Sequence, residues 1–144
     1  MDIMIREAES RDISVIVQLI QELGTDTDRS PLTETFMTQY LDSPTSTILL
    51  AETQGNVIGL LSYSLRPDLY HAANSCLIEE LVVQESMRGK GVGSALLGEL
   101  LSRLSSRNCA EVSLAVMPDN TGAIRFYKLH GLTEEGLLLE RHFN

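Results

Sequence analysis

Residues 84–100 read QESMRGKGVGSALLGEL, and three glycines alternate through this stretch at positions 89, 91 and 93. Glycine inside or beside a helix costs about 1 kcal/mol relative to alanine, so an ordinary surface loop would not carry three of them. Behind the glycines, apolar side chains recur with helical spacing at Val92, Leu96, Leu97, Leu100, Leu101 and Leu104. The stretch therefore predicts a glycine-rich loop that opens a long amphipathic helix.

This loop has the features of an anion-binding site. A helix N-terminus exposes unpaired N–H groups and a partial positive charge, and glycine lets the backbone approach a ligand closely. Arg88 and Lys90 add positive charge at the same place, in a chain whose formal net charge is −9. Phosphate is the kind of ligand that such a nest of N–H groups binds well.

Two common phosphate-binding patterns do not match the loop. The Rossmann fingerprint G-x-G-x-x-G requires a third glycine where Ser94 stands. It also requires an acidic residue about twenty positions further on, where the chain has Arg107 and Asn108. The Walker pattern G-x-x-x-x-G-K-[ST] is absent from the sequence. The motif that remains to be explained is Arg88-Gly89-Lys90-Gly91-Val92-Gly93.

The rest of the chain alternates between strand and helix patterns. Besides the long helix, the periodicity predicts helices at residues 11–23, capped by Ser10, and at 32–41 and 120–130. Strands are expected at residues 3–8, 46–53, 56–64, 75–83, 111–117 and 137–143, with a longer loop over 65–74. Consecutive strands joined by hairpins pair antiparallel, and the later strand–helix–strand crossover implies parallel pairing. We therefore expect one α/β domain over residues 1–144, a mixed sheet with helices on both faces.

Composition narrows the classes of partner. A net charge of −9 argues against nonspecific binding to nucleic acid or to anionic membranes, which requires a basic surface. The sequence has no apolar run of membrane-spanning length, and its first residues do not resemble a signal peptide, so a cytoplasmic location is expected. Cys76 and Cys109 are expected to be reduced and buried, and no metal site is expected because no metal-ligand spacing occurs.

The glycine motif resembles the Q/R-x-x-G-x-G/A motif of the Gcn5-related N-acetyltransferases (GNAT), in which this loop wraps the pyrophosphate of acetyl-coenzyme A. Two flanking segments strengthen the likeness: LIEELVV at 77–83 and NTGAIRFYKLHG at 120–131. The order of elements also agrees, so the resemblance spans nearly the whole chain. It implies the GNAT (acyl-CoA N-acyltransferase) fold, with a mixed, mostly antiparallel central sheet. It also implies transfer of an acetyl group to a primary amine.

By the same resemblance, the strand before the loop splays from its neighbour and binds the pantetheine arm through its backbone. The N–H of Val82 is then expected to polarise the thioester carbonyl. The residues that the resemblance assigns to acetyl-coenzyme A are Leu81, Val82, Val83, Arg88, Gly89, Lys90, Gly91, Val92, Gly93, Ser94, Asn120, Ala123 and Phe126. For Asn120 and Phe126, capping the last helix and filling the core are the alternatives.

The attacking amine must lose a proton, which costs about 4 kcal/mol at pH 7.5 for an ordinary alkylamine. Glu79 and Glu80 both lie on the strand that leads to the loop, but alternation lets only one face a cleft unless a bulge intervenes. The resemblance favours Glu79 as the base, with Glu80 supporting it or binding substrate. It makes Tyr127 the acid that protonates the leaving thiolate, since a phenol keeps its proton at neutral pH.

The resemblance also implies that residues 24–36 and 65–74 build the acceptor pocket, where Tyr70 and His71 could contribute to the lining. Its acidic residues outnumber its basic ones and favour a cationic small-molecule amine; the charged residues are Asp26, Asp28, Glu34, Asp68, Arg29 and Arg66. A protein acetyltransferase (N-terminal or lysine) and a noncatalytic acetyl-coenzyme A-binding module are the alternatives. Because relatives often pair, sometimes through the C-terminal strand, a homodimer is expected.

Overall fold

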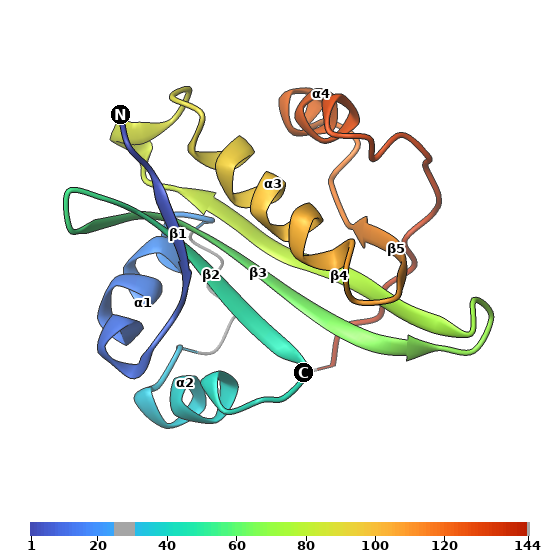
Figure 1. The fold of residues 1–144 in the computed structure, drawn as a ribbon, viewed down its shortest axis with the longest axis horizontal. Helices are drawn as coiled ribbons and strands as arrows, with labels where there is room; N and C mark the ends of the chain where they lie inside the picture. Colours follow the sequence, from blue (N-terminus) through green and yellow to red (C-terminus); the bar gives the residue numbers. More distant parts are fainter. Residues whose placement is uncertain (25–30, 144) are drawn as a thin grey trace.

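The computed structural model describes residues 1–24 and 31–143 (Figure 1). Its helices are α1 (Ile13–Gln21), α2 (Glu34–Leu41), α3 (Val92–Leu104) and α4 (Thr121–Leu129), with two short 3-10 helices, η1 (Ser10–Asp12) and η2 (Glu85–Met87). Its strands are β1 (Met4–Glu7), β2 (Ser46–Thr53), β3 (Asn56–Asp68), β4 (Ala73–Val83) and β5 (Cys109–Leu114).

The five strands form one sheet in the order β1-β2-β3-β4-β5. The first four pair antiparallel, and β5 runs parallel to β4 because α3 provides the crossover between them. The mixed, mostly antiparallel sheet is therefore confirmed. The β2–β3 hairpin turns through Gln54 and Gly55, which have φ of 51° and 80°, as a two-residue turn with both central residues left-handed requires.

Helices cover both faces of this sheet, and each face has its own apolar core. On one face, α3 lies over the sheet and packs with Leu49, Leu61 and Ile78 (Figure 1). On the other face, which we call the acceptor face, α1 and α2 pack against Leu50, Leu60 and Val82. Adjacent residues such as Leu60 and Leu61 enter opposite cores because strand side chains alternate.

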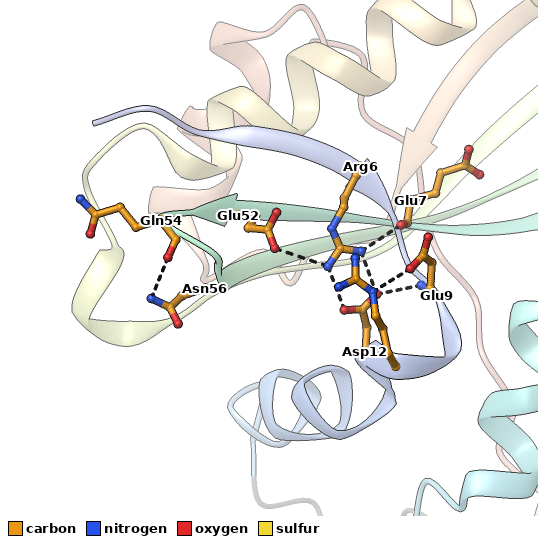
Figure 2. A network of polar contacts seen from close by, with 8 residues as sticks. Arg6, Glu7, Glu9, Asp12, Glu52, Gln54 and Asn56 are labelled. Atoms are coloured by element: carbon orange, nitrogen blue, oxygen red, sulfur yellow. Dashed lines mark hydrogen bonds and ion pairs between the residues drawn. The ribbon is translucent and has the colours of Figure 1, made fainter.

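The start of α1 is fixed by an ion-pair network (Figure 2). Arg6 of β1 makes two hydrogen bonds to the Asp12 carboxylate, at 2.8 and 2.9 Å, and lies 3.6 Å from Glu52 of β2. Asp12 also accepts the Glu9 N–H at 2.8 Å. Arg6 therefore holds the pKa of Asp12 below its usual range. The expected cap at Ser10 is wrong, because Glu9 precedes η1 and α1 begins only at Ile13.

The predicted loop over 65–74 is much shorter than expected. β3 continues to Asp68 and β4 starts at Ala73. The Asp68 carboxylate closes this turn, accepting from Ser75 Oγ at 2.6 Å and pairing with His71 Nδ1 at 2.6 Å. A side-chain network of this kind cannot be read from hydropathy, which made the segment look like a loop.

The strand expected at 137–143 does not form, and residues 132–143 contain no helix or strand. Its apolar side chains, Leu137, Leu138 and Leu139, are 94%, 62% and 89% exposed. A strand is stable only when a neighbour satisfies its backbone, and within the described chain this segment pairs with none. The pattern predicted an apolar strand at 137–143, but this segment pairs with none of the described strands.

Candidate active site

The glycine loop connects η2 to α3 and presents free backbone N–H groups. Gly89 and Gly91 have φ of +75° and +86°, a region that L side chains rarely adopt. The first helical hydrogen bond of α3 runs from Ala95 N to Gly91 O, at 3.0 Å. Among the described residues, none accepts a hydrogen bond from the N–H groups of residues 89–94. The loop and helix start thus form the row of donors that an anion would require.

Two basic side chains flank these amides in different ways. Arg88 is tied to the scaffold, because its Nε donates to Val83 O at 3.1 Å and its Nη2 lies 3.6 Å from Glu22 Oε2. Lys90 has no ion pair or hydrogen bond with any residue that the structure describes. The positive charge of Lys90 is therefore available to a ligand at the helix start.

Beside this loop, β4 extends beyond the end of its neighbour β5 (Figure 1). The pairing of the two strands ends at Ile78 and Leu114, and β4 continues to Val83. Gln84 N donates to Ile58 O at 2.8 Å, so alternate residues, including Val82, direct their N–H groups to β3. The N–H groups of Leu81 and Val83 therefore point to the open edge. The expected role of the Val82 N–H in polarising a carbonyl does not fit this register.

A β-bulge brings both glutamates to the acceptor face. Ser62 pairs with Glu80 and Tyr63 pairs with Ile78, which leaves Glu79 as the extra residue. Ser62 Oγ donates to the Glu80 carboxylate and accepts the Glu80 N–H at 3.0 Å. Ser64 Oγ donates to Glu79 Oε1 at 3.3 Å. The bulge thus breaks the alternation that would have turned one of the two carboxylates to the opposite face.

Tyr40 of α2 lies near this pair of carboxylates and was missed by the sequence reasoning. Its hydroxyl is buried near Ser46 and Ser62 and makes no well-aligned hydrogen bond to a described residue. Burial, and then the charges of Glu79 and Glu80, raise the pKa of Tyr40. In the sequence, Tyr40 lies four residues after Phe36 on the apolar side of a helix, where nothing separates it from a core tyrosine.

α4 lies against the start of α3 and carries Tyr127. Asn120 Oδ1 accepts the Ala123 N–H at 3.2 Å, so Asn120 caps the helix. The ring of Phe126 covers Gly93, where an added Cβ would lie 3.4 Å from Phe126 Cζ. Burial raises the pKa of Tyr127, which keeps the phenol protonated at neutral pH.

Only some of the residues expected to form the acceptor pocket lie near the two glutamates. Asp26, Asp28 and Arg29 lie outside the described residues. Asp68 and His71 belong to the far end of the β3–β4 hairpin, six strand positions from Ser62 and so about 20 Å away along β3. Tyr70, at the tip of that hairpin, is 92% exposed. The expectation that Tyr70 and His71 line the same pocket as the glutamates is therefore wrong.

The described residues offer neither a metal site nor a membrane-spanning helix. Within residues 1–24 and 31–143, no cluster of three or more His, Cys, Asp or Glu side chains is arranged to bind a metal. In the same ranges, no helix has the length and apolar character needed to cross a bilayer. A cavity of about 970 Å³ opens between the N-terminus, α1, the β2–β3 hairpin and η2, but neither glutamate nor Tyr127 lines it.

Comparison with known proteins assigns the chain to a family. Residues 16–132 match the family model described as the acetyltransferase (GNAT) family. The L-amino acid N-acetyltransferase AaaT of Escherichia coli (strain K12) is 31% identical over 142 residues, covering 94% of this chain and 85% of that protein. The aminoalkylphosphonate N-acetyltransferase of Salmonella typhimurium (strain LT2) is 32% identical over 130 residues, covering 88% and 82%.

Among solved structures, one titled as a transcriptional regulator from Bacillus halodurans C-125 superimposes with a TM-score of 0.84. It is 24% identical and covers 99% of this chain and 100% of that chain, so it supports the fold alone. The family match extends from α1 past α4 and includes the glycine loop, both glutamates and Tyr127. The chain is thus an acetyltransferase that belongs to the GNAT family.

Proposed function

We propose that this enzyme moves an acetyl group from acetyl-coenzyme A to the primary amine of a small molecule by direct transfer. The observation that carries this function is the bulge at Glu79, which brings two carboxylates to one face of β4 beside the open edge of the same strand. The relatives named above act on an amino acid and on aminoalkylphosphonates, which are small amines.

The described residues fit the cosubstrate. Six unpaired N–H groups and the Lys90 ammonium suit a diphosphate. The free edge of β4 at Leu81 and Val83 suits an arm that contains amides, because an extended chain can add to such an edge. When bound, acetyl-coenzyme A supplies an acyl group activated as a thioester.

Each side chain then has a distinct task. Glu79 is exposed and makes one long hydrogen bond, so it is free to accept the proton of the amine. Glu80 is held by Ser62 through two contacts, which suits it to orient the ammonium before that proton leaves. The Leu81 N–H is available to stabilise negative charge on the acyl oxygen. Tyr127 Oη holds the proton that the departing sulfur requires.

The thiols offer no competing nucleophile. Burial raises the pKa of Cys76 to about 12, so almost none of it is thiolate at neutral pH. Cys109 is half-buried at the opposite end of the paired region from the open edge of β4. Direct transfer therefore needs fewer assumptions than a route through an acetylated cysteine.

The test measures thiol release from acetyl-coenzyme A across a panel of small amines. We expect Glu79→Gln to lower kcat/KM about 10²- to 10⁴-fold, the usual contribution of a general base. Glu134→Gln is the matched control, since Glu134 is exposed and lies outside the site. No release with any small amine would overturn the proposal. Release with peptides alone would favour a protein acetyltransferase, and binding without release would favour a noncatalytic module.

The predicted homodimer is tested separately, by measuring the mass of the protein with light scattering as it elutes from a size-exclusion column. A single species of about 32 kDa is expected, twice the 15.9 kDa of one chain. A species of one chain mass at micromolar concentration would contradict the prediction.

A further inference from the structure

We infer that Arg66 binds an anionic group on the amine substrate, so that the acceptor is an amine that also carries a carboxylate or a phosphonate. This inference rests on the proposed function and names its substrate class. It depends on where Arg66 lies, on the absence of a competing partner, and on the charges that share its face.

Arg66 lies on the acceptor face, in line with the serines that contact the glutamates. Leu61, Tyr63 and Leu65 of β3 all pack into the core beneath α3. Their even-numbered neighbours therefore face the other way, which puts Ser62, Ser64 and Arg66 on one row. Alternate residues of a strand are about 7 Å apart, so Arg66 follows Ser64, the partner of Glu79, by one step along that row. One small molecule can span such a step.

The guanidinium of Arg66 is exposed and has no ion pair or hydrogen bond with any described residue. By contrast, Arg6, Arg11, Arg88 and Arg103 each contact a carboxylate. Arg107 and Arg125 also contact no described carboxylate, so Arg66 is singled out by its place on the acceptor face. Its positive charge is therefore free to bind a ligand.

The nearest acidic residue on the same row, Asp68, is already engaged. Its Oδ2 contacts Ser75 Oγ and His71 Nδ1, and its Oδ1 accepts the Tyr70 N–H at 3.0 Å. Ser75, directly across from Arg66 on β4, gives its hydroxyl proton to the same carboxylate. The Asp68 carboxylate is thus bound within the hairpin and does not pair with Arg66.

The two carboxylates of β4 therefore lie beside Ser62 and Ser64, and the free guanidinium lies one step further along β3. An ammonium placed at Glu79 and Glu80 leaves an anion on the same molecule directed toward Arg66. The planar fork of arginine suits carboxylate and phosphonate oxygens, which it can bind through two parallel hydrogen bonds. A simple polyamine would instead bring a second positive charge to Arg66.

The test compares three substrates in wild type, Arg66→Gln and Arg66→Lys: an L-amino acid, its carboxamide, and an aminoalkylphosphonate. Each variant is compared with wild type on the same substrate, so differences in amine pKa cancel. We expect Arg66→Gln to raise KM for the two anionic amines about 10- to 150-fold, as for loss of a hydrogen bond between charged groups. We expect kcat to change little, and Arg66→Lys to restore part of the loss.

The carboxamide distinguishes a binding role from a structural one, because its KM should stay within about twofold of wild type. Arg107→Gln is the matched control, since Arg107 is also exposed and lies in the turn before β5. Equal losses on acid and carboxamide would overturn the inference, as would an unchanged KM for both anionic amines in Arg66→Gln. Thiol release without anion preference would refute the inference and leave the acetyltransferase proposal intact. No release with any amine would refute that proposal itself.

Discussion

Replacing Gly91 by alanine should destabilise the enzyme by a predictable amount, because the cost comes from the backbone alone. Gly91 has φ of +86°, and an added Cβ would meet no atom within 4 Å. Neither steric overlap nor a lost contact contributes. A left-handed residue that is not glycine costs about 1–2 kcal/mol. With about 2.1 cal/mol/K of unfolding entropy per residue, 144 residues shift Tm by about 3 °C per kcal/mol. We expect Tm to fall by about 3–6 °C.

Gly98 provides the matched control in the same helix. It lies inside α3, without positive φ, and an added Cβ there also meets no atom within 4 Å. Alanine is favoured over glycine in a helix interior by about 1 kcal/mol, so Gly98→Ala should raise Tm by about 3 °C. Differential scanning calorimetry of wild type and both variants checks the two signs. Equal shifts in the two variants, or a Gly91→Ala protein as stable as wild type, would refute the reasoning.

Three further outcomes are expected. Tyr127→Phe should lower kcat far more than it weakens binding of acetyl-coenzyme A in calorimetric titration, and equal losses would speak against the acid role. Tyr40→Phe should leave the free energy of unfolding unchanged or raise it, because the hydroxyl is buried without a well-aligned partner; a large loss in urea unfolding would show that the hydroxyl is satisfied. The Asp68 hydrogen bond raises the pKa of His71, so this pair stabilises the fold below about pH 6.5 and stops doing so as pH rises through the folded-state pKa. The stability advantage of wild type over His71→Gln, measured as urea midpoints, should therefore shrink between pH 6 and pH 9, and an advantage independent of pH would count against that ion pair.

The sequence was most informative where one local pattern determines one structure. The alternating glycines before an apolar helix predicted the loop and α3, and the two-residue gap between the strands expected at 46–53 and 56–64 predicted the β2–β3 hairpin. Each of these depends on residues that are neighbours in the chain, so periodicity and turn chemistry suffice. Asn120 was assigned to the cosubstrate with capping as the alternative, and the structure shows the cap, which follows from its place just before α4.

Features that depend on pairing or packing with a distant segment of the chain could not be predicted from the sequence. The bulge at Glu79 exists only in the pairing with β3, so sequence reasoning could state it as a condition but not as a finding. The bulge also changes which backbone groups face β3, so the N–H of Val82, which was expected to polarise the thioester carbonyl, is directed to β3. Tyr40 of α2 lies close enough to the glutamates for their charges to raise its pKa, a proximity that no spacing in the chain encodes.

The bulge also makes the length of β4 matter more than its composition. One residue removed between Glu80 and Val83 would exchange the two edges of the strand, so that amides now directed outward would turn to β3. One residue added there would do the same, whatever its side chain. Substitutions at Leu81 or Val83 leave that backbone geometry in place, because only main-chain atoms are involved. Engineering of this segment should therefore hold its residue count constant and limit changes at Leu81 and Val83 to apolar residues of similar size, because both pack against the core beneath α3.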